Sequence, residues 1–429
     1  MRGYTPLAGV RVLSFELAYS LPAATRLLAE LGAEVVKVAP PRGVGFADFT
    51  TATDGVSLGK PNIAINLKTA EGRELARALV AQADVVCSNF TAPVMPSFGL
   101  GVEDLHAIKP DLIVLRLSGY GAPGPWTEFP AFAAATEAVA GLNSVQGQDA
   151  DPPVRVGSGI FADQLSGMYA ALAIVAALEQ RQRTGQGRSI DLAMAECVTE
   201  MIGAAVLETS RTGDLPARPG NRDACAAPQG TYPCRGTDQW IAITIANDAQ
   251  WRTLVDLTGD AGLATPEWSA AAARRGAHEE IDCRLAEWTR AHHKDALAAM
   301  LQSHGIAAGP VNQVDDLLFD PHLAERHVFQ SVEHPRPLLG FSSHPHPAMP
   351  WTAVGRRRGM SRDIRPSGAD NYAVLHRWLG TSRAEVKRLQ ACGALTFGGR
   401  FGIDTVPDAP GMPRDPTYAT RLGLPRAEP

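Results

Sequence analysis

The chain has 429 residues, of which 45% are hydrophobic and 20% are charged, and its formal net charge is −5. This length exceeds what one ordinary hydrophobic core supports, so two domains are expected. A mildly acidic chain has no general attraction for the phosphates of nucleic acid or of a membrane surface, so neither is an expected partner. A phosphorylated ligand would need a local group of lysines and arginines.

The first 120 residues alternate short apolar stretches with helical patterns. Strands are predicted at residues 10–15, 34–39, 84–90 and 112–121, and helices from Ser20 and over 69–83. Such alternation is typical of an α/β fold, a Rossmann-like parallel sheet with helices on both faces. Ligands of such sheets bind beyond the carboxyl ends of the strands, which lie here near Ser20, Pro40, Asn89 and Ser118.

The second half of the chain indicates a separate unit. The stretch 211–235 is rich in Gly, Pro and Arg and is expected to be a linker or loop. A strand pattern at 239–248 opens the unit, and helices are predicted near 249–258 and 279–303. A helical hairpin is predicted over 368–393, before a tail in which Gly and Pro are frequent.

Targeting and metal-binding signals are absent from the sequence. The N-terminal stretch lacks the apolar core and cleavage site of a signal peptide, and no run of about 18 apolar residues predicts a membrane span. The six cysteines lie far apart without a C-x-x-C pair, which is typical of reduced cysteines and not of a zinc site. We therefore expect a cytoplasmic protein with no metal and no membrane partner.

Familiar nucleotide and hydrolase motifs are also missing. The sequence has no P-loop, no glycine fingerprint after the first strand, no H-E-x-x-H and no G-x-S-x-G. His106 is the only histidine among the first 200 residues, so chemistry in this part must use carboxylates, hydroxyls, amides or backbone groups. Lys60 and Lys68 bracket a short apolar segment and could both reach one anionic ligand, although either alone is an ordinary surface charge.

One acidic residue stands in an unusual place. Asp163 directly precedes a long apolar pattern that predicts a helix over 164–183. Asp is a common N-cap, so a local structural role accounts for its position. A carboxylate held at a helix N-terminus is also placed to react with a ligand. Position alone leaves both interpretations open.

Six stretches together resemble the family III CoA-transferases, the group that includes formyl-CoA transferase, carnitine CoA-transferase and α-methylacyl-CoA racemase. Their order and spacing match the family from residue 5 to residue 395. The stretches are "PLAGVRVLSFELAYSLPAATRLLAELGAEVVKVAPP", "SLGKPNIAINLKTAEGRELARALVAQADVVCSNF", "SGYGAPGPW", "FADQLSGMYAALAIVAALEQRQRTGQGRSIDLAM", "APQGTYPC" and "GPVNQVDDLLFDPHLAERHVF".

The resemblance implies that Asp163 is the catalytic aspartate. In that family the carboxylate attacks a donor acyl-CoA, and a mixed anhydride and an aspartyl-CoA thioester lead to the new acyl-CoA. Backbone N–H groups at a helix start would stabilise the carboxylate or the oxyanion formed on attack. Coenzyme A is then a co-substrate, and no cofactor is tightly bound. The acceptor is a free carboxylic acid, which could be dicarboxylic.

The same matching implies the residues that bind CoA. They are Ala18, Tyr19, Ser20, Lys68, Asn89, Phe90 and Phe132. Lys60 is added as a further cation because of its position across the apolar segment from Lys68. Tyr19 stands where formyl-CoA transferase-like members have Gln, and Pro40 and Thr91 stand where they have Arg. A distal carboxylate of the substrate could pair with one of three arginines, which otherwise are surface or structural residues: Arg155, Arg222 or Arg235.

The resemblance also implies the domain plan and the assembly, an interlocked homodimer. A large α/β CoA-binding domain would take both chain ends, and a smaller α+β domain the middle. The predicted ranges are 1–215 for the first part of the large domain, 216–235 for a linker, 236–330 for the small domain, 331–395 for the return to the large domain and 396–429 for the Gly/Pro-containing tail.

Three other functions compete with CoA transfer. A racemase on the same scaffold needs a base on each face of the substrate, but the position that matches the histidine of that branch is Phe132. Asp248 lies near where racemases present an acidic partner. A non-catalytic CoA-binding relative is opposed by the intact Asp163, and a nucleotide-dependent oxidoreductase by the missing glycine fingerprint.

Overall fold

The chain folds into two compact units. The structure, a computed structural model, describes residues 4–41, 55–155, 157, 160–338, 341–352, 365 and 367–396. The larger unit contains residues 1–142, 155–207 and 324–429, and the smaller unit contains residues 143–154 and 208–323. The division differs in detail from the expected one, because the smaller unit also takes residues 143–154 and begins before residue 216.

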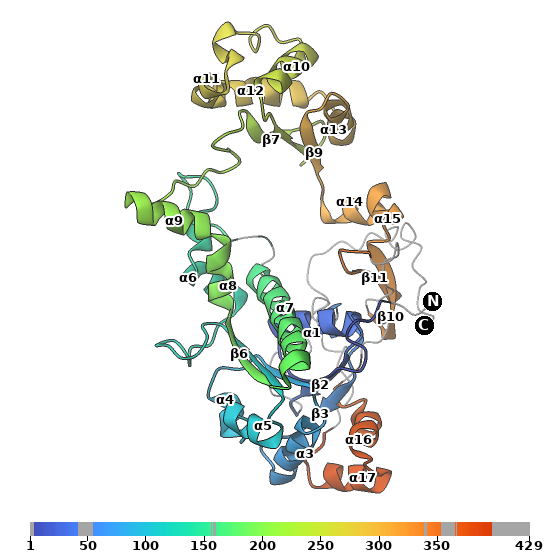
Figure 1. Cartoon of the computed structure of the whole chain (residues 1–429). Helices are drawn as coiled ribbons and strands as arrows, with labels where there is room; N and C mark the ends of the chain where they lie inside the picture. The colour runs from blue at the N-terminus through green and yellow to red at the C-terminus, as the bar shows by residue number, and fades with distance from the viewer. Residues whose placement is uncertain are drawn as a thin grey trace. The chain divides into compact units, whose positions relative to one another are not determined.

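A six-stranded parallel sheet forms the centre of the larger unit (Figure 1). Its strands are β1 Arg11–Phe15, β2 Glu34–Ala39, β3 Asn62–Ala64, β4 Val85–Ser88, β5 Ile113–Ser118 and β6 Arg188–Ala193. The order β3-β2-β1-β4-β5-β6 is that of a doubly wound sheet, which confirms the predicted α/β fold. The order reverses between β1 and β4, so the crevice beyond the carboxyl ends of these two strands is the expected ligand site.

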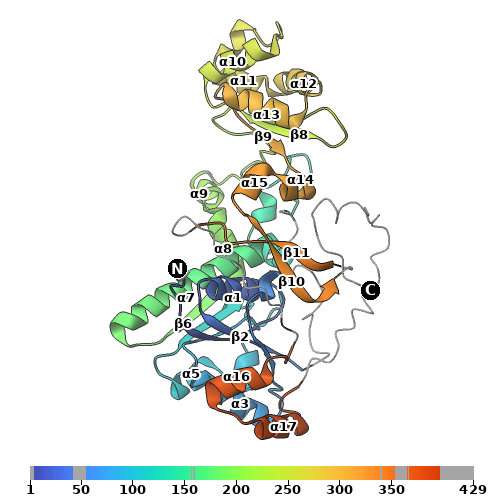
Figure 2. The same cartoon turned by 90° about the vertical axis from the view of Figure 1, so that its right-hand side faces the viewer.

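Helices cover both faces of this sheet (Figures 1 and 2). One face packs against α1 Ser20–Glu30, α6 Ala133–Val139, α7 Phe161–Thr184 and α8 Met194–Met201. The other face packs against α3 Ala70–Val80, α4 Val94–Ser97, α5 Val102–Ile108, α16 Asn371–Leu379 and α17 Arg383–Ala391. Successive side chains of a strand point to opposite faces, and so Val12 lies in the first core whereas Leu13 lies in the second.

The C-terminal part of the larger unit closes the edge of the sheet at β3. The Asp370 carboxylate accepts a hydrogen bond from the Asn62 backbone N–H at 2.9 Å, and the Asn371 side-chain oxygen accepts one from Ala64 at 3.0 Å. Ile65 pairs with Leu395 in an isolated antiparallel bridge. The predicted helical hairpin is therefore α16 and α17, and it belongs to the same unit as the N-terminus.

Helix α7 is long and apolar enough to cross a membrane by length and composition, and it is the one such helix in the described part of the chain. Its buried residues include Ala162, Ser166, Ala170 and Ile174, and they pack in the core together with α1. These contacts account for part of the apolar character of α7, while Met168 and Leu172 of the same helix are exposed.

The smaller unit is built on an antiparallel sheet of β7 Gln229–Pro233, β8 Trp240–Thr244 and β9 Ala307–Val311. Its core packs against α10 Asp248–Thr258, α12 His278–Thr289 and α13 Lys294–Ser303, and α11 Ala271–Gly276 contributes the buried Arg274. Other elements in the described residues are α9 Gly203–Thr212, α14 Val314–Phe319, α15 Pro321–Glu325, the hairpin β10 Phe329–Leu338 and β11 Phe341–Pro347, and short 3-10 turns at Leu142–Ser144 and Pro266–Ser269.

Two predictions for this part were wrong. The predicted linker 216–235 contains β7, which pairs with β8 and buries Tyr232 in the core. The predicted helix 279–303 is two helices, because the chain becomes extended at His293 (ψ 136°) before α13 begins. The predicted tail lies outside the described residues, apart from Thr396.

Candidate active site

The loop between β1 and α1 lies at the point where the strand order reverses. Asn89, which follows β4, holds this loop with both ends of its side-chain amide. Its Oδ1 accepts a hydrogen bond from the Leu17 N–H at 2.9 Å, and its Nδ2 donates to the Leu17 carbonyl at 2.8 Å. Nδ2 also lies 3.4 Å from the Ser20 hydroxyl. The structure thus brings the predicted residues of the loop and Asn89 together, with Asn89 shaping the loop.

A buried ion pair lies beneath the same loop. Lys60 Nζ donates to Glu16 Oε1 at 2.5 Å, to the Thr25 hydroxyl at 2.9 Å and to the Pro22 carbonyl at 3.2 Å. Glu16 Oε2 accepts from the hydroxyls of Ser14 at 2.7 Å and Thr25 at 2.6 Å. Burial opposes ionisation of Glu16, but the ammonium groups of Lys60 and Lys37 and the hydrogen bonds from Lys60 and Thr25 together outweigh it. They hold the pKa of this carboxyl below its usual value.

Lys60 is therefore not the surface cation that its sequence context suggested. Its side chain has no exposed surface and its ammonium is enclosed by protein acceptors, whereas Lys68 is exposed. Glu16 follows β1, Thr25 and Pro22 belong to α1, and Lys60 precedes β3, so the pair ties three segments together. The predicted joint binding of one anion by Lys60 and Lys68 does not fit this arrangement.

Asp163 lies inside the first turn of α7 and is not its N-cap. The helix begins at Phe161, with Ile160 at the N-cap and no side-chain cap from that residue. The N-cap interpretation was thus wrong. A glutamate from α6 takes the capping role instead, since Glu137 Oε1 accepts a hydrogen bond from the Ala162 N–H at 3.3 Å. Within the described chain no residue donates a hydrogen bond to the Asp163 carboxylate, which leaves its oxygens available to a ligand.

The surroundings of Asp163 disfavour its ionised form. Burial, and after it the nearby carboxylate of Glu137, raise the pKa of Asp163 to about 6. Glu137 is itself fully buried, with Arg155 Nε 3.8 Å from its Oε2. A half-buried carboxylate without hydrogen bonds is poorly solvated, so it is a better nucleophile than a surface carboxylate once it is ionised.

Tyr19 links the loop to the first turn of α7. It is the N-cap residue of α1, and its hydroxyl oxygen accepts a hydrogen bond from Gln164 Nε2 at 2.8 Å. Gln164 directly follows Asp163. The loop at the strand reversal and the Asp163 carboxylate therefore belong to one site.

Close packing of α1 against α7 sets this geometry. Gly167 lies on α7 where it meets α1, and a Cβ added there would lie 2.9 Å from the Ser20 carbonyl oxygen and 3.0 Å from Ala23 Cβ. No side chain fits at such distances without movement of the backbone. Glycine at this position allows the start of α1 to approach the turn that follows Asp163.

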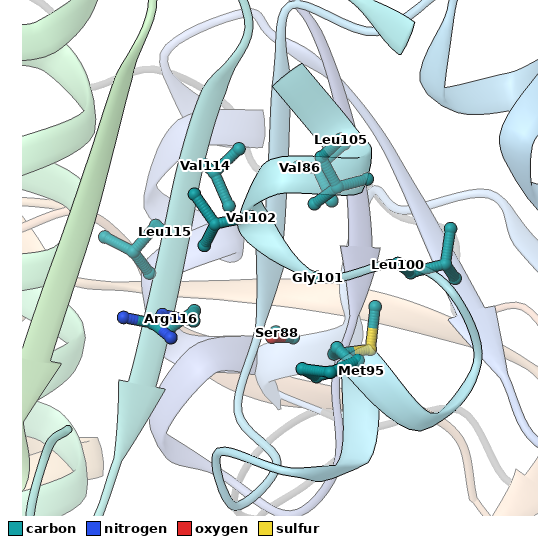
Figure 3. A pocket seen from close by; sticks show the side chains of 11 residues that line it. Val86, Ser88, Met95, Leu100, Gly101, Val102, Leu105, Val114, Leu115 and Arg116 are labelled. Carbon is teal, nitrogen blue, oxygen red and sulfur yellow. The ribbon is translucent and has the colours of Figure 1, made fainter. Parts of the chain in front are cut away.

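A small pocket in the larger unit lies elsewhere (Figure 3). Its lining is apolar except for Ser88 and Arg116, and Arg116 lies 3.6 Å from Asp191 in an ion pair. Residues that line it, such as Met95 and Leu105, belong to the core on the face of α3 and α5. Asp163 lies on the opposite face, so this pocket is not part of the site.

Comparisons with known proteins decide the family. Residues 7–371 match the family described as CoA-transferase family III. The chain belongs to CoA-transferase family III.

Named relatives of this family III member are CoA-transferases. It is 35% identical over 341 residues to the succinyl-CoA–D-citramalate CoA-transferase of Chloroflexus aurantiacus, covering 77% of this chain and 84% of the relative. It is 30% identical to the succinate–glutarate CoA-transferase of Agrobacterium fabrum, covering 76% and 85%. A crystal structure of a CaiB/BaiF family protein from Brucella suis matches with a TM-score of 0.78 at 29% identity, covering 88% of this chain and 100% of that one. The chain is thus an enzyme of acyl-CoA:carboxylate CoA transfer, as expected from the sequence.

The structure also describes the other residues that were predicted to bind CoA in this CoA-transferase. Lys68 follows β3 and is exposed, Phe90 follows Asn89 and is partly buried against the core, and Phe132 is the N-cap residue of α6 with 61% of its surface exposed. No group of three or more His, Cys, Asp or Glu in the described part of the chain is placed to hold a metal ion.

Sequence reasoning missed Glu16, Glu137 and Gln164. The first two are charged residues within or beside apolar stretches, "VLSFEL" and "AAATEAVAG", where a charge without a partner would be costly. That conflict was the available signal. Their partners, Lys60 and the start of α7, are far away in sequence and come together only in the fold.

Asp248 of the smaller unit is engaged in an ion pair. Its Oδ1 accepts a hydrogen bond at 2.8 Å from Arg274, a fully buried arginine whose other donors bind the carbonyls of Ala227, Trp268 and Ser269. The hydrogen bond from Arg274 lowers the pKa of Asp248. A general base works best with a pKa near the operating pH, so this carboxylate is poorly suited to remove an α-proton.

Proposed function

We propose that Asp163 is the nucleophile of CoA transfer in this chain. The observation that carries the proposal is the Asp163 carboxylate itself: half-buried, raised in pKa to about 6, and free of hydrogen-bond donors within the described chain. Structural carboxylates of this protein, such as Glu16 and Asp248, are instead bound by cations. Above pH 6 most of Asp163 is ionised and ready to attack.

The reaction conserves the thioester through two exchanges. Asp163 attacks the carbonyl carbon of the donor acyl-CoA; the C–S bond breaks, and an acyl-aspartyl anhydride and CoA thiolate form. The thiolate attacks the Asp163 carbonyl carbon, which releases the donor acid and leaves an aspartyl-CoA thioester. The acceptor carboxylate then displaces CoA thiolate to form a second anhydride, and the thiolate takes the new acyl group and frees Asp163. No net proton is consumed.

We propose dicarboxylic acids as the substrates, with succinyl-CoA as the first donor to test. Relatives at 30–35% identity are named for the transfer of CoA from succinyl-CoA to D-citramalate, mesaconate or L-malate, or between succinate and glutarate. Arg155 is the one of the three predicted arginines in the same unit as Asp163, next to Glu137, and so is our first choice for the distal carboxylate.

The CoA moiety is proposed to bind along the carboxyl edge of the sheet. Ala18, Tyr19, Ser20, Lys68, Phe90 and Phe132 remain in the proposed set, and Asn89 acts through the shape of the loop. Lys68 is the cation of this set for a phosphate group. Lys60 is left out because its ammonium is enclosed.

We further propose that the chain forms a homodimer, interlocked as in the proteins that it resembles. An exposed apolar surface supports the dimer. Met168 and Leu172 stand one turn apart on α7, exposed at 59% and 64%, and Met201, Val206 and Leu207 extend the surface over α8 and α9. The test is light scattering of the purified protein. The expected cytoplasmic location and the absence of nucleic-acid and membrane partners stay predictions.

Trapping of the aspartyl intermediate tests the proposed function. The protein is incubated with succinyl-CoA and hydroxylamine, digested and analysed by mass spectrometry. A hydroxamate should form on Asp163 and on no other carboxylate, and it should be absent without the CoA ester. A matrix of donor thioesters and free acids, followed by mass spectrometry of the CoA products, then identifies the substrates. Transfer that persists in Asp163→Ala would overturn the assignment.

Racemisation is the second function to test on the same preparation. The residues available for a second base are unsuitable, because Phe132 cannot carry a proton and Asp248 is bound by Arg274. No deuterium should enter the α-position of 2-methylacyl-CoA esters in deuterated water under conditions where CoA exchange is fast. Uptake that vanished in Asp248→Asn would favour a racemase.

A further inference from the structure

The Tyr19 hydroxyl can still donate one hydrogen bond. A phenol carries one hydrogen and accepts through its oxygen. The oxygen accepts from Gln164 Nε2 at 2.8 Å, so this contact does not use the hydrogen. No other described residue receives it. The hydrogen is therefore available to an acceptor that enters the site.

The hydroxyl lies in the electrostatic field of Asp163. Burial raises the pKa of Tyr19 and the Asp163 carboxylate contributes in the same direction, while Arg26 opposes both. The phenol consequently keeps its hydrogen at the pH values at which Asp163 is ionised. A neutral donor beside a carboxylate nucleophile is suited to bind the oxygen on which charge develops during attack.

Tyr19 is held rigidly by its own loop. Asn89 binds both backbone groups of Leu17, and Ala18 adopts a left-handed conformation (φ 55°) that a non-glycine residue rarely adopts. The buried Glu16–Lys60 pair fixes the loop from below through Thr25 and Pro22. A donor fixed before the substrate arrives needs no reorganisation when charge appears.

We propose that the Tyr19 hydroxyl, oriented by Gln164, donates a hydrogen bond to the acyl oxygen of the thioester that Asp163 attacks. The inference deepens the proposed function and rests on it. In the first step a bond forms between an Asp163 oxygen and the acyl carbon, and negative charge moves onto the acyl oxygen. When the C–S bond breaks, the electron pair leaves on the CoA sulfur. Tyr19 keeps its proton throughout, so no proton has to be replaced.

Tyr19→Phe removes the donor and keeps the ring. We expect kcat for CoA transfer to fall about 10- to 100-fold while the KM for the acyl-CoA changes less than about threefold, since the bond strengthens mainly in the transition state. Tyr169→Phe is the matched control: it removes a tyrosine hydroxyl from α7 whose partner is Glu200, and it should keep wild-type rates. A Tyr19→Phe variant with wild-type kcat would overturn the inference.

Gln164→Leu tests the positioning role. If Gln164 acts through the Tyr19 hydroxyl, Gln164→Leu lowers kcat by about 3- to 10-fold in the wild-type background and has no further effect in Tyr19→Phe. A purely structural role of Gln164 would give additive losses. Additivity in this cycle would contradict the orienting contact.

The pH profile separates two possible acceptors of the hydrogen. If the hydroxyl bound the Asp163 carboxylate in the free enzyme, Tyr19→Phe would shift the acidic limb of kcat/KM to higher pH. Donation to the substrate instead leaves this limb in place, which is the expected result. A shifted limb would overturn the substrate as acceptor.

Hydroxylamine trapping on the same variants distinguishes this inference from the proposed function. Tyr19→Phe should form the hydroxamate on Asp163 more slowly than wild type, at the same residue. If Tyr19→Phe transfers CoA and forms the Asp163 hydroxamate as fast as wild type does, the proposed role of Tyr19 is wrong and the role of Asp163 stands. If wild type neither transfers CoA nor traps at Asp163, both fail.

Discussion

Two carboxylates at the same edge of the sheet have opposite surroundings. Glu16 is fully buried, accepts three hydrogen bonds and has a pKa below its usual value. Asp163 is half-buried, receives no hydrogen bond within the described chain and has a pKa raised to about 6. Burial disfavours ionisation of both, so the partners and not the depth decide the outcome.

If Asp163 is the nucleophile as proposed, this difference is one between a structural carboxylate and a reactive one. Glu16 with Lys60 joins three segments, and its oxygens are occupied. Asp163 has no such partner, and the neighbouring Glu137 makes its charge less favourable still. A carboxylate kept poorly solvated costs stability in the free protein and gains reactivity toward a thioester carbon.

Replacement of Asp163 should give the largest effect and should act on activity and stability in opposite directions. Asp163→Asn is expected to lower kcat for CoA transfer by at least about 1000-fold, since the nucleophile is lost. It should also raise the free energy of unfolding at pH 7.5 by about 1–3 kcal/mol, because an ionised group with a raised pKa destabilises the folded state. Steady-state rates and urea unfolding check both. A variant less stable than wild type would mean that Asp163 is a structural carboxylate like Glu16.

Breaking the Glu16–Lys60 pair should cost the most stability. Lys60→Met leaves Glu16 buried without its cation, and the free energy of unfolding is expected to fall by about 3–5 kcal/mol. The double variant Glu16→Met/Lys60→Met removes both charges and should recover most of the loss. Urea unfolding of the single and double variants gives the coupling energy, and a single variant as stable as wild type would show that Glu16 does not depend on its cation.

Gly167→Ala probes the contact between α1 and α7 that joins the two carboxylate sites. The added methyl group meets the backbone of Ser20 at 2.9 Å, so α7 must move. Overpacking of this kind costs about 1–3 kcal/mol, and we expect a loss of CoA transfer larger than the change in stability explains. Gly276→Ala is the control, because an added Cβ there meets nothing within 4 Å. Equal rates in both variants would contradict the proposed role of this contact.

The pH dependence should show the raised pKa of Asp163 directly. Between pH 4 and pH 6 the folded protein binds more protons at Asp163 than the unfolded chain does, so this group makes the protein less stable as pH rises through that window. The rate follows the opposite course: kcat/KM should fall about tenfold per pH unit below pH 6. An acidic limb near pH 4 would place Asp163 among ordinary carboxylates.

Lys68→Ala should give the smallest effect. Lys68 is exposed and lies outside the buried cluster that holds Lys60, so its loss should leave stability within about 0.5 kcal/mol of wild type. The apparent KM for acyl-CoA should rise about 3- to 10-fold with kcat nearly unchanged, as expected for binding that is equal in the ground and transition states. If the KM of Lys68→Ala equalled that of wild type, both for the CoA ester and for the dephospho-CoA ester, Lys68 would not be a phosphate-binding residue.

Local patterns predicted the sheet and its helices because strands buried on both faces are continuous apolar runs. The ends of strands were less predictable, since pairing with a neighbour decides where a strand stops; the stretch 84–90 forms a strand only at Val85–Ser88. Strand β7 escaped prediction because "QGTYP" contains Gly and Pro and buries one side chain, Tyr232. Its pairing with β8 is what makes it a strand.

The candidate site was predicted from motifs of the sequence. The family resemblance predicted Asp163 and the loop 18–20. It did not predict that Lys60 is buried and Lys68 is exposed. Two lysines eight residues apart look alike in sequence, and only the fold places Glu16 beside one of them. The charged and polar groups near Asp163 are likewise set by tertiary contacts, with Glu137 on α6 and Tyr19 on the loop before α1.

The closure of β3 by the C-terminal segment has a consequence for the order of folding. Asp370 and Asn371 bind the backbone N–H groups of Asn62 and Ala64, and Leu395 pairs with Ile65. During synthesis the sheet therefore has an open edge at β3 for as long as the following 300 or so residues are being made, about 15–60 s at about 5–20 residues per second. An open strand edge is a template for association with other chains. A chain terminated before residue 370 should therefore be prone to aggregation and should not form a smaller active enzyme.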